Sequence, residues 1–171
     1  MAARAGRDSQ TKRIKEWFES GDGDFACTGI TDSFAAFLLS DSGERQILVI
    51  TETETQARKM AEDIDAFSDK PVFFLPGREI NFYESYAHSR DTESERARVL
   101  GHVVSGRPLF VTSSVDNLLI PFRKPKDYAS GIKTIEWGGR YPLGDLTGFL
   151  LKSGYESVDQ IRSKGQFSRR W

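Results

Sequence analysis

The segment of residues 29–36 has the length of a phosphate-binding loop but lacks the residues that hold a phosphate. A working loop reads G-x-x-x-x-G-K-S/T after the first strand of a parallel sheet. Its glycines let backbone N–H groups face the phosphates, its lysine neutralises charge, and its hydroxyl holds magnesium. The matching positions here are Gly29, Ile30, Thr31, Asp32, Ser33, Phe34, Ala35 and Ala36.

Of the fixed positions in that pattern, only Gly29 agrees. Phe34 replaces the second glycine and would crowd the turn. Ala35 and Ala36 replace the lysine and the hydroxyl, and Asp32 adds negative charge where a triphosphate would lie. The segment therefore predicts no tight ATP binding and no catalysis. Two interpretations stay open: an ordinary strand-to-helix turn, or a weak anion site at the N-terminus of the following helix.

The remaining composition points to no cofactor. Cys27 is the single cysteine, so no internal disulfide forms, which fits a reducing cytoplasm. His88 and His102 lack cysteine or acidic companions at metal-ligand spacing, so we expect no metal site. We expect no secretory signal in residues 1–11 and no membrane contact, because no apolar run reaches the ~18 residues of a membrane span. The net charge of -1 gives no global attraction to nucleic acid.

Helical and strand patterns alternate along the chain. The expected helices are residues 9–20, 34–39, 53–67, 92–105, 115–120 and 142–152, and the expected strands are residues 25–28, 46–51, 71–75, 109–112 and 132–137. The inward positions of the third helix include Phe67, and those of the fourth include Ala97. Continuous apolar strands between amphipathic helices predict an α/β fold with a parallel sheet covered on both faces.

The pattern changes near residues 127–130, where we place a domain boundary. The first domain would comprise residues 1–128 and the second residues 129–171. The second piece has roughly 40 residues, which are too few to bury a core alone. It is therefore expected either to lean on the first domain or to be an incomplete domain.

Short motifs occur in a fixed order at residues 28–33, 47–51, 75–79, 82–84, 95–96, 110–112, 154–155, 158–160 and 165–167. Together they resemble the amino-terminal, UvrB-like region of bacterial transcription-repair coupling factors, the Mfd family. The resemblance covers nearly the whole chain from Ile14 onward. It implies a helicase-like P-loop fold with a degenerate loop, followed by the start of a small α+β domain that recruits the repair ATPase UvrA. RNA polymerase and DNA would be contacted only by other parts of the parent protein, an ATP-dependent DNA translocase.

The resemblance also implies a partner-binding segment at the carboxyl-terminal end. UvrB has phenylalanine, arginine, any residue, arginine and glycine there, and this chain has Phe167, Ser168, Arg169, Arg170 and Trp171. Arg170 matches the second arginine, and Arg169 lies beside it. In the family these arginines face acidic groups of UvrA, for which the planar guanidinium is suited. The family continues beyond this segment, so the small domain is expected to be incomplete. A solvated, frayed end is the alternative interpretation.

Three functional classes follow from these features. The leading hypothesis is a non-catalytic module that supports recruitment of UvrA to stalled RNA polymerase in nucleotide excision repair. The alternative is an ATP-binding helicase or UvrB-like excision-repair fragment acting on DNA. A purely structural, autoinhibitory surface is a third hypothesis, compatible with the first. Phe82, Tyr83 and Tyr86 could stack on DNA bases, but packing is favoured because the nearby Arg78 and Arg90 are opposed by Glu79, Glu84 and Asp91. Residues 76–91 are also too few for the DNA-probing hairpin of UvrB.

Overall fold

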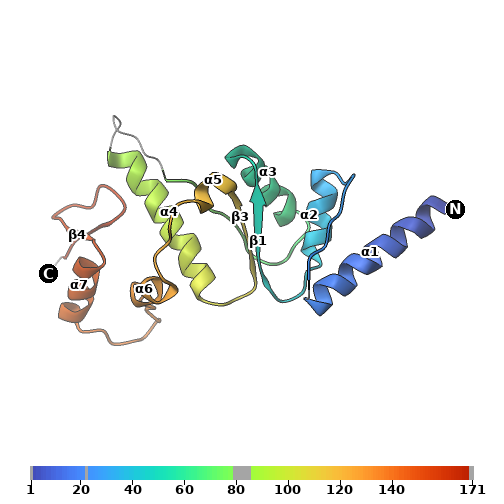
Figure 1. Ribbon diagram of the computed structural model, residues 1–171. Coiled ribbons are helices and arrows are strands. Elements are labelled where there is room, and N and C mark those ends of the chain that lie inside the picture. Colours follow the sequence, from blue (N-terminus) through green and yellow to red (C-terminus); the bar gives the residue numbers. More distant parts are fainter. Residues whose placement is uncertain (1, 22, 79–85, 170–171) are drawn as a thin grey trace. The chain divides into compact units, whose positions relative to one another are not determined.

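The computed structural model describes residues 2–21, 23–78 and 86–169 (Figure 1). These residues belong to two compact units. Unit 1 comprises Met1–Leu75 and Gly106–Ile120, and unit 2 comprises Pro76–Ser105 and Pro121–Trp171. The expected domain boundary after residue 128 falls within a helix, Pro125–Ser130, and stays a prediction.

Unit 1 is built on a three-stranded parallel sheet. Its strands are β1 (Gln46–Thr51), β2 (Val72–Phe74) and β3 (Leu109–Ser114), in the order β1-β3-β2. The register places Gln46 opposite Leu109 and Val72 opposite Phe110. The central strand β3 is buried at all of its positions. The prediction of an α/β fold with a parallel sheet is confirmed.

Unit 1 also contains the helices α1 (Ala2–Ser20), α2 (Asp32–Ser40), α3 (Glu54–Asp65) and α5 (Val115–Leu118). Of these, α3 contacts all three strands, α5 contacts β3, and α2 packs against α3. The core centres on fully buried Ala36, Ile64 and Phe110, with Leu39, Ile47, Val49, Met60 and Val72 packed around them. The apolar positions of α3 recur at helical spacing, which directs them to one face. Phe67 lies just beyond α3 and is 49% exposed, so its predicted inward position is wrong.

Two expectations about unit 1 are wrong in detail. Residues 25–28 form no strand and are exposed. Phe25 instead lies 5.9 Å from the ring of Trp17, whose indole N–H donates to the carbonyl of Gly23 at 3.1 Å. Strand β1 is not buried on both faces either, because Leu48 and Ile50 are 51% and 55% exposed.

Unit 2 contains the long helix α4 (Tyr86–Val104), the short helices α6 (Pro125–Ser130) and α7 (Leu143–Lys152), and a two-stranded parallel sheet. That sheet pairs β4 (Glu156–Ser157) with β5 (Gln166–Phe167). Within residues 91–104 of α4, Arg96 and Val99 are buried, whereas Ala97 is exposed, contrary to the expected inward face.

The strand expected at residues 132–137 is also absent. The chain turns there instead, at Gly138, whose φ of 79° lies in the left-handed region that favours glycine. The N–H of Glu136 donates to the hydroxyl of Tyr141 at 2.9 Å rather than to a neighbouring strand. Ile135 and Trp137 are left exposed. Among the helices of the described residues, none has both the length and the apolarity to span a membrane.

Candidate binding sites

The residues expected to resemble a phosphate-binding loop enter helix α2 directly. Gly29 has a φ of 73°, which a side-chain-bearing residue adopts only with strain. Thr31 is the N-cap of α2, with extended backbone and no side-chain capping bond, and Asp32 is the first helical residue. The N–H of Ala35 donates to the carbonyl of Thr31 at 2.9 Å. The backbone N–H at the position of the motif lysine is thus hydrogen-bonded within the helix.

Side chains of this segment make contacts typical of packing. The Ser33 hydroxyl donates to a carboxylate oxygen of Asp63 at 3.4 Å. Phe34 stacks on Phe37, with ring centroids 6.2 Å apart. Ala36, which stands where the magnesium-holding hydroxyl would be, is fully buried in the core. Because residues 25–28 form no strand, the segment also does not follow a strand of the sheet, as the loop comparison had assumed.

A small cavity of about 220 Å³ lies beside the start of α2 and α3. Its lining residues are Asp32, Thr51, Glu52, Gln56, Lys59 and Met60. Two carboxylates therefore face one ammonium group, so the lining carries no excess positive charge. This balance disfavours a triphosphate, which needs several cations or a metal ion beside it. No cluster of metal-ligating side chains occurs within the described ranges.

The carboxyl-terminal segment is held by the small sheet of unit 2. The N–H of Val158 donates to the carbonyl of Phe167 at 2.9 Å, and Phe167 is half-buried in β5. The side-chain oxygen of Gln166 accepts from the N–H groups of Arg162 and Ser163, at 2.9 and 3.2 Å. Arg169 follows β5 and is exposed, while Arg170 lies outside the described residues.

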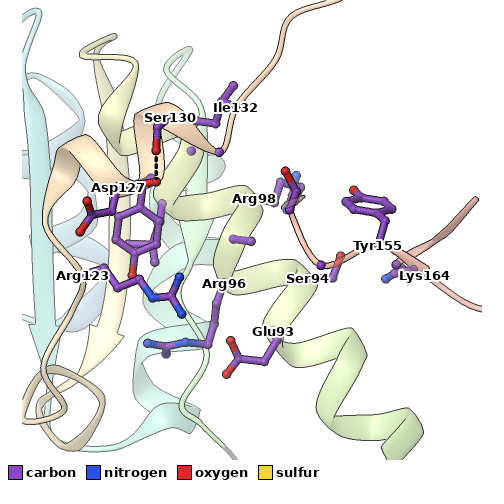
Figure 2. A pocket seen from close by; sticks show the side chains of 18 of the residues that line it. Glu93, Ser94, Arg96, Arg98, Arg123, Asp127, Ser130, Ile132, Tyr155 and Lys164 are labelled. Atoms are coloured by element: carbon purple, nitrogen blue, oxygen red, sulfur yellow. Dashed lines mark hydrogen bonds between the residues drawn. The ribbon is translucent and has the colours of Figure 1, made fainter. Parts of the chain in front are cut away.

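A larger pocket, of about 1140 Å³, lies within unit 2 (Figure 2). Helices α4, α6 and α7 and residues 153–156 and 164–165 line it. Its basic lining residues are Arg78, Arg96, Arg98, Arg123, Lys152 and Lys164, and its acidic ones are Glu93, Asp127 and Glu156. Sequence reasoning missed this pocket, because alternating charges on a helix usually mark a solvated face.

Arg96 is the unusual member of that lining. Only 3% of it is exposed, and its guanidinium donates to the carbonyl of Pro76 and lies 5.5 Å from the ring of Phe122. Burial lowers the pKa of Arg96, an effect that the nearby carboxylate of Glu93 opposes and the positive charge of Arg78 reinforces. The signal that could have indicated the pocket is therefore an arginine at an inward position of α4.

Comparisons with models of protein families and with curated proteins found no match to this chain.

Proposed function

We propose that the chain is a non-catalytic module of the UvrB-like type found at the amino terminus of transcription-repair coupling factors. Its role would be to support recruitment of UvrA to stalled RNA polymerase in nucleotide excision repair. In this proposal unit 1 belongs to a helicase-like domain with helices on both faces of its sheet, and the last residues begin a small α+β domain. The ordered motifs from residue 28 to residue 167 support it, and so does the parallel sheet.

The observation that carries the non-catalytic part is the burial of Ala36. In a working loop this position presents a hydroxyl to magnesium beside the phosphates. Here the side chain is enclosed by Ile64 and Phe110 in the core, so it has no access to a ligand. The N–H of Ala35 is bonded within helix α2, and Asp32 occupies the helix N-terminus. These features favour a scaffold that has kept its packing and has no means of holding nucleotide.

The partner-binding part of the proposal rests on the carboxyl-terminal arginines. Arg169 is exposed and lies two residues beyond β5, whose pairing with β4 fixes the path of the chain. An exposed guanidinium on an ordered strand end can form paired hydrogen bonds with a carboxylate at little entropic cost. Arg170 occupies the position that the family resemblance assigns to the second arginine.

Calorimetric titration of purified UvrA into the chain tests this assignment. We expect saturable binding that weakens at least tenfold, roughly, when Arg169 and Arg170 are both changed to glutamate, since charged hydrogen bonds are lost and repulsion is gained. The matched control changes Lys12 and Arg13, an exposed adjacent pair on α1, to glutamate and should leave the affinity unaltered. Equal weakening by both double variants would show that the arginines form no specific site.

A further inference from the structure

We infer that the unit 2 pocket is a docking site for a short acidic protein segment that also carries apolar side chains. The site is formed by α4, α6 and α7 and is distinct from the carboxyl-terminal arginines of the proposed function. We call three basic residues of its lining, Arg78, Arg96 and Arg123, the basic end, and its apolar residues Leu100, Ile132 and Phe149 the floor.

The basic end has more positive charge than its carboxylates neutralise. Arg78 pairs with Glu93 at 3.3 Å, and the same carboxylate stabilises the charge of Arg96. Arg123 and Lys152 line the pocket and form no ion pair with any other described residue. Figure 2 shows Arg96 and Arg123 extending their guanidinium groups toward the same part of the pocket. The unpaired positive charge of Arg123 and Lys152 would stabilise a carboxylate from a ligand.

The floor of the pocket is apolar. Leu100, Ile132 and Phe149 line it. The Cδ1 atom of Ile132 lies 3.5 Å from the point that a Cβ at Gly101 would occupy, so Ile132 lies against α4. The ammonium group of Lys133 lies 5.6 Å from the ring of Phe149. Ile132 remains 49% exposed, which leaves an apolar surface for a leucine or an aromatic side chain of a ligand.

Size and charge pattern favour a peptide over other anions. The volume of about 1140 Å³ is at the upper limit of cavities that enclose small molecules, which reach roughly 1,000 Å³. Nucleic acid requires a continuous basic track for its phosphates. Here Glu93, Asp127 and Glu156 interrupt the cations, and the floor is aliphatic as well as aromatic. An acidic, partly apolar protein segment matches both features.

Fluorescence anisotropy on the full chain tests the inference. The probe is a fluorescein-labelled peptide in which glutamate alternates with leucine, compared with its glutamine counterpart and with a labelled oligothymidine. We expect the glutamate peptide to bind best and Arg123→Glu to weaken it about tenfold. The matched control is Lys124→Glu, which makes the same charge change at the adjacent exposed residue outside the pocket lining. Circular dichroism confirms that both variants fold.

Each alternative outcome overturns the inference. No binding of the glutamate peptide at millimolar concentration, equal weakening by both variants, or tighter binding of oligothymidine would exclude a specific acidic-segment site. If the glutamine peptide bound as tightly as the glutamate peptide, the binding would come from the apolar side chains alone. The double change of Arg169 and Arg170 to glutamate should weaken the peptide far less than Arg123→Glu does, so failure here and failure of the proposed UvrA site are distinguishable.

Discussion

At the scale of single residues, Ala36 and Arg96 are two buried helix positions with different roles. Both side chains are almost completely buried. Ala36 fills space in an apolar core, so a serine or threonine at this position would place its hydroxyl inside that core. Arg96 keeps a charge at a buried position, with one backbone carbonyl and one aromatic ring as its described contacts. The first position serves packing, and the second is the one we connect with binding.

Restoring the loop residues one at a time should have unequal effects on stability. Ala36→Thr adds volume and a hydroxyl to the packed core and should lower the free energy of unfolding by about 1–3 kcal/mol. Ala35→Lys places a flexible chain at a half-buried helix position and should cost less than about 1 kcal/mol. Urea unfolding of the two variants measures the difference. Equal costs would contradict the packing role of Ala36.

At the scale of elements, local signals located most helices and strands. The apolar run of β1 and the helical spacing in α3 each correspond to a described element. The same signals failed at residues 25–28 and 132–137, because a strand exists only where a neighbouring strand accepts its hydrogen bonds. Phe25 instead meets Trp17, and Glu136 bonds Tyr141. Both contacts depend on the folded chain and are invisible in a short window of sequence.

Helix α3 begins with a capping box that should contribute measurably to stability. The Thr53 hydroxyl accepts from the N–H of Gln56 at 3.3 Å, and the side-chain oxygen of Gln56 accepts from the N–H of Thr53 at 3.2 Å. Thr53→Ala should therefore lower the free energy of unfolding by about 1 kcal/mol. Thr55→Ala, within the exposed first turn, is the control and should be neutral or slightly stabilising. Urea unfolding compares the two, and equal losses would argue against the cap.

Helix α4 carries an ion pair whose contribution should depend on pH. Glu95 accepts from Arg98 at 2.6 Å, and this hydrogen bond lowers the pKa of Glu95. A depressed carboxyl pKa stabilises the fold above the ordinary glutamate pKa of about 4.3, and the contribution disappears as the pH falls through the folded value.

Glu95→Gln should therefore lower the free energy of unfolding slightly at pH 7, by less than about 0.5 kcal/mol because the pair is largely solvated. The difference from the unaltered chain should vanish in strongly acidic solution. Unfolding curves at several pH values measure it, with Glu62→Gln as a control at an exposed carboxyl on α3. A difference that persisted below pH ~3 would contradict the assigned cause.

At the scale of the whole molecule, the division into units was the least predictable feature. The chain leaves unit 1 after Leu75 and returns to it at Gly106, so each unit combines segments that are distant in the sequence. Sequence patterns report contacts between near neighbours along one helix or strand. They did not indicate that α4 and α6 would line one pocket with residues 153–156 and 164–165, and its charges looked like an ordinary surface. The predictions for residues 29–36 and 167–170 came instead from motif comparison and stay predictions.

We propose that an α/β scaffold of this kind serves partner binding without holding nucleotide. Titration of the full chain with Mg²⁺-ATP in a calorimeter tests it most directly, with circular dichroism on the same sample to confirm folding. Because Asp32, Ala35 and Ala36 leave the loop without a cation, a magnesium ligand or open space, we predict no saturable heat up to millimolar ATP. Stoichiometric binding in the micromolar range would contradict the account.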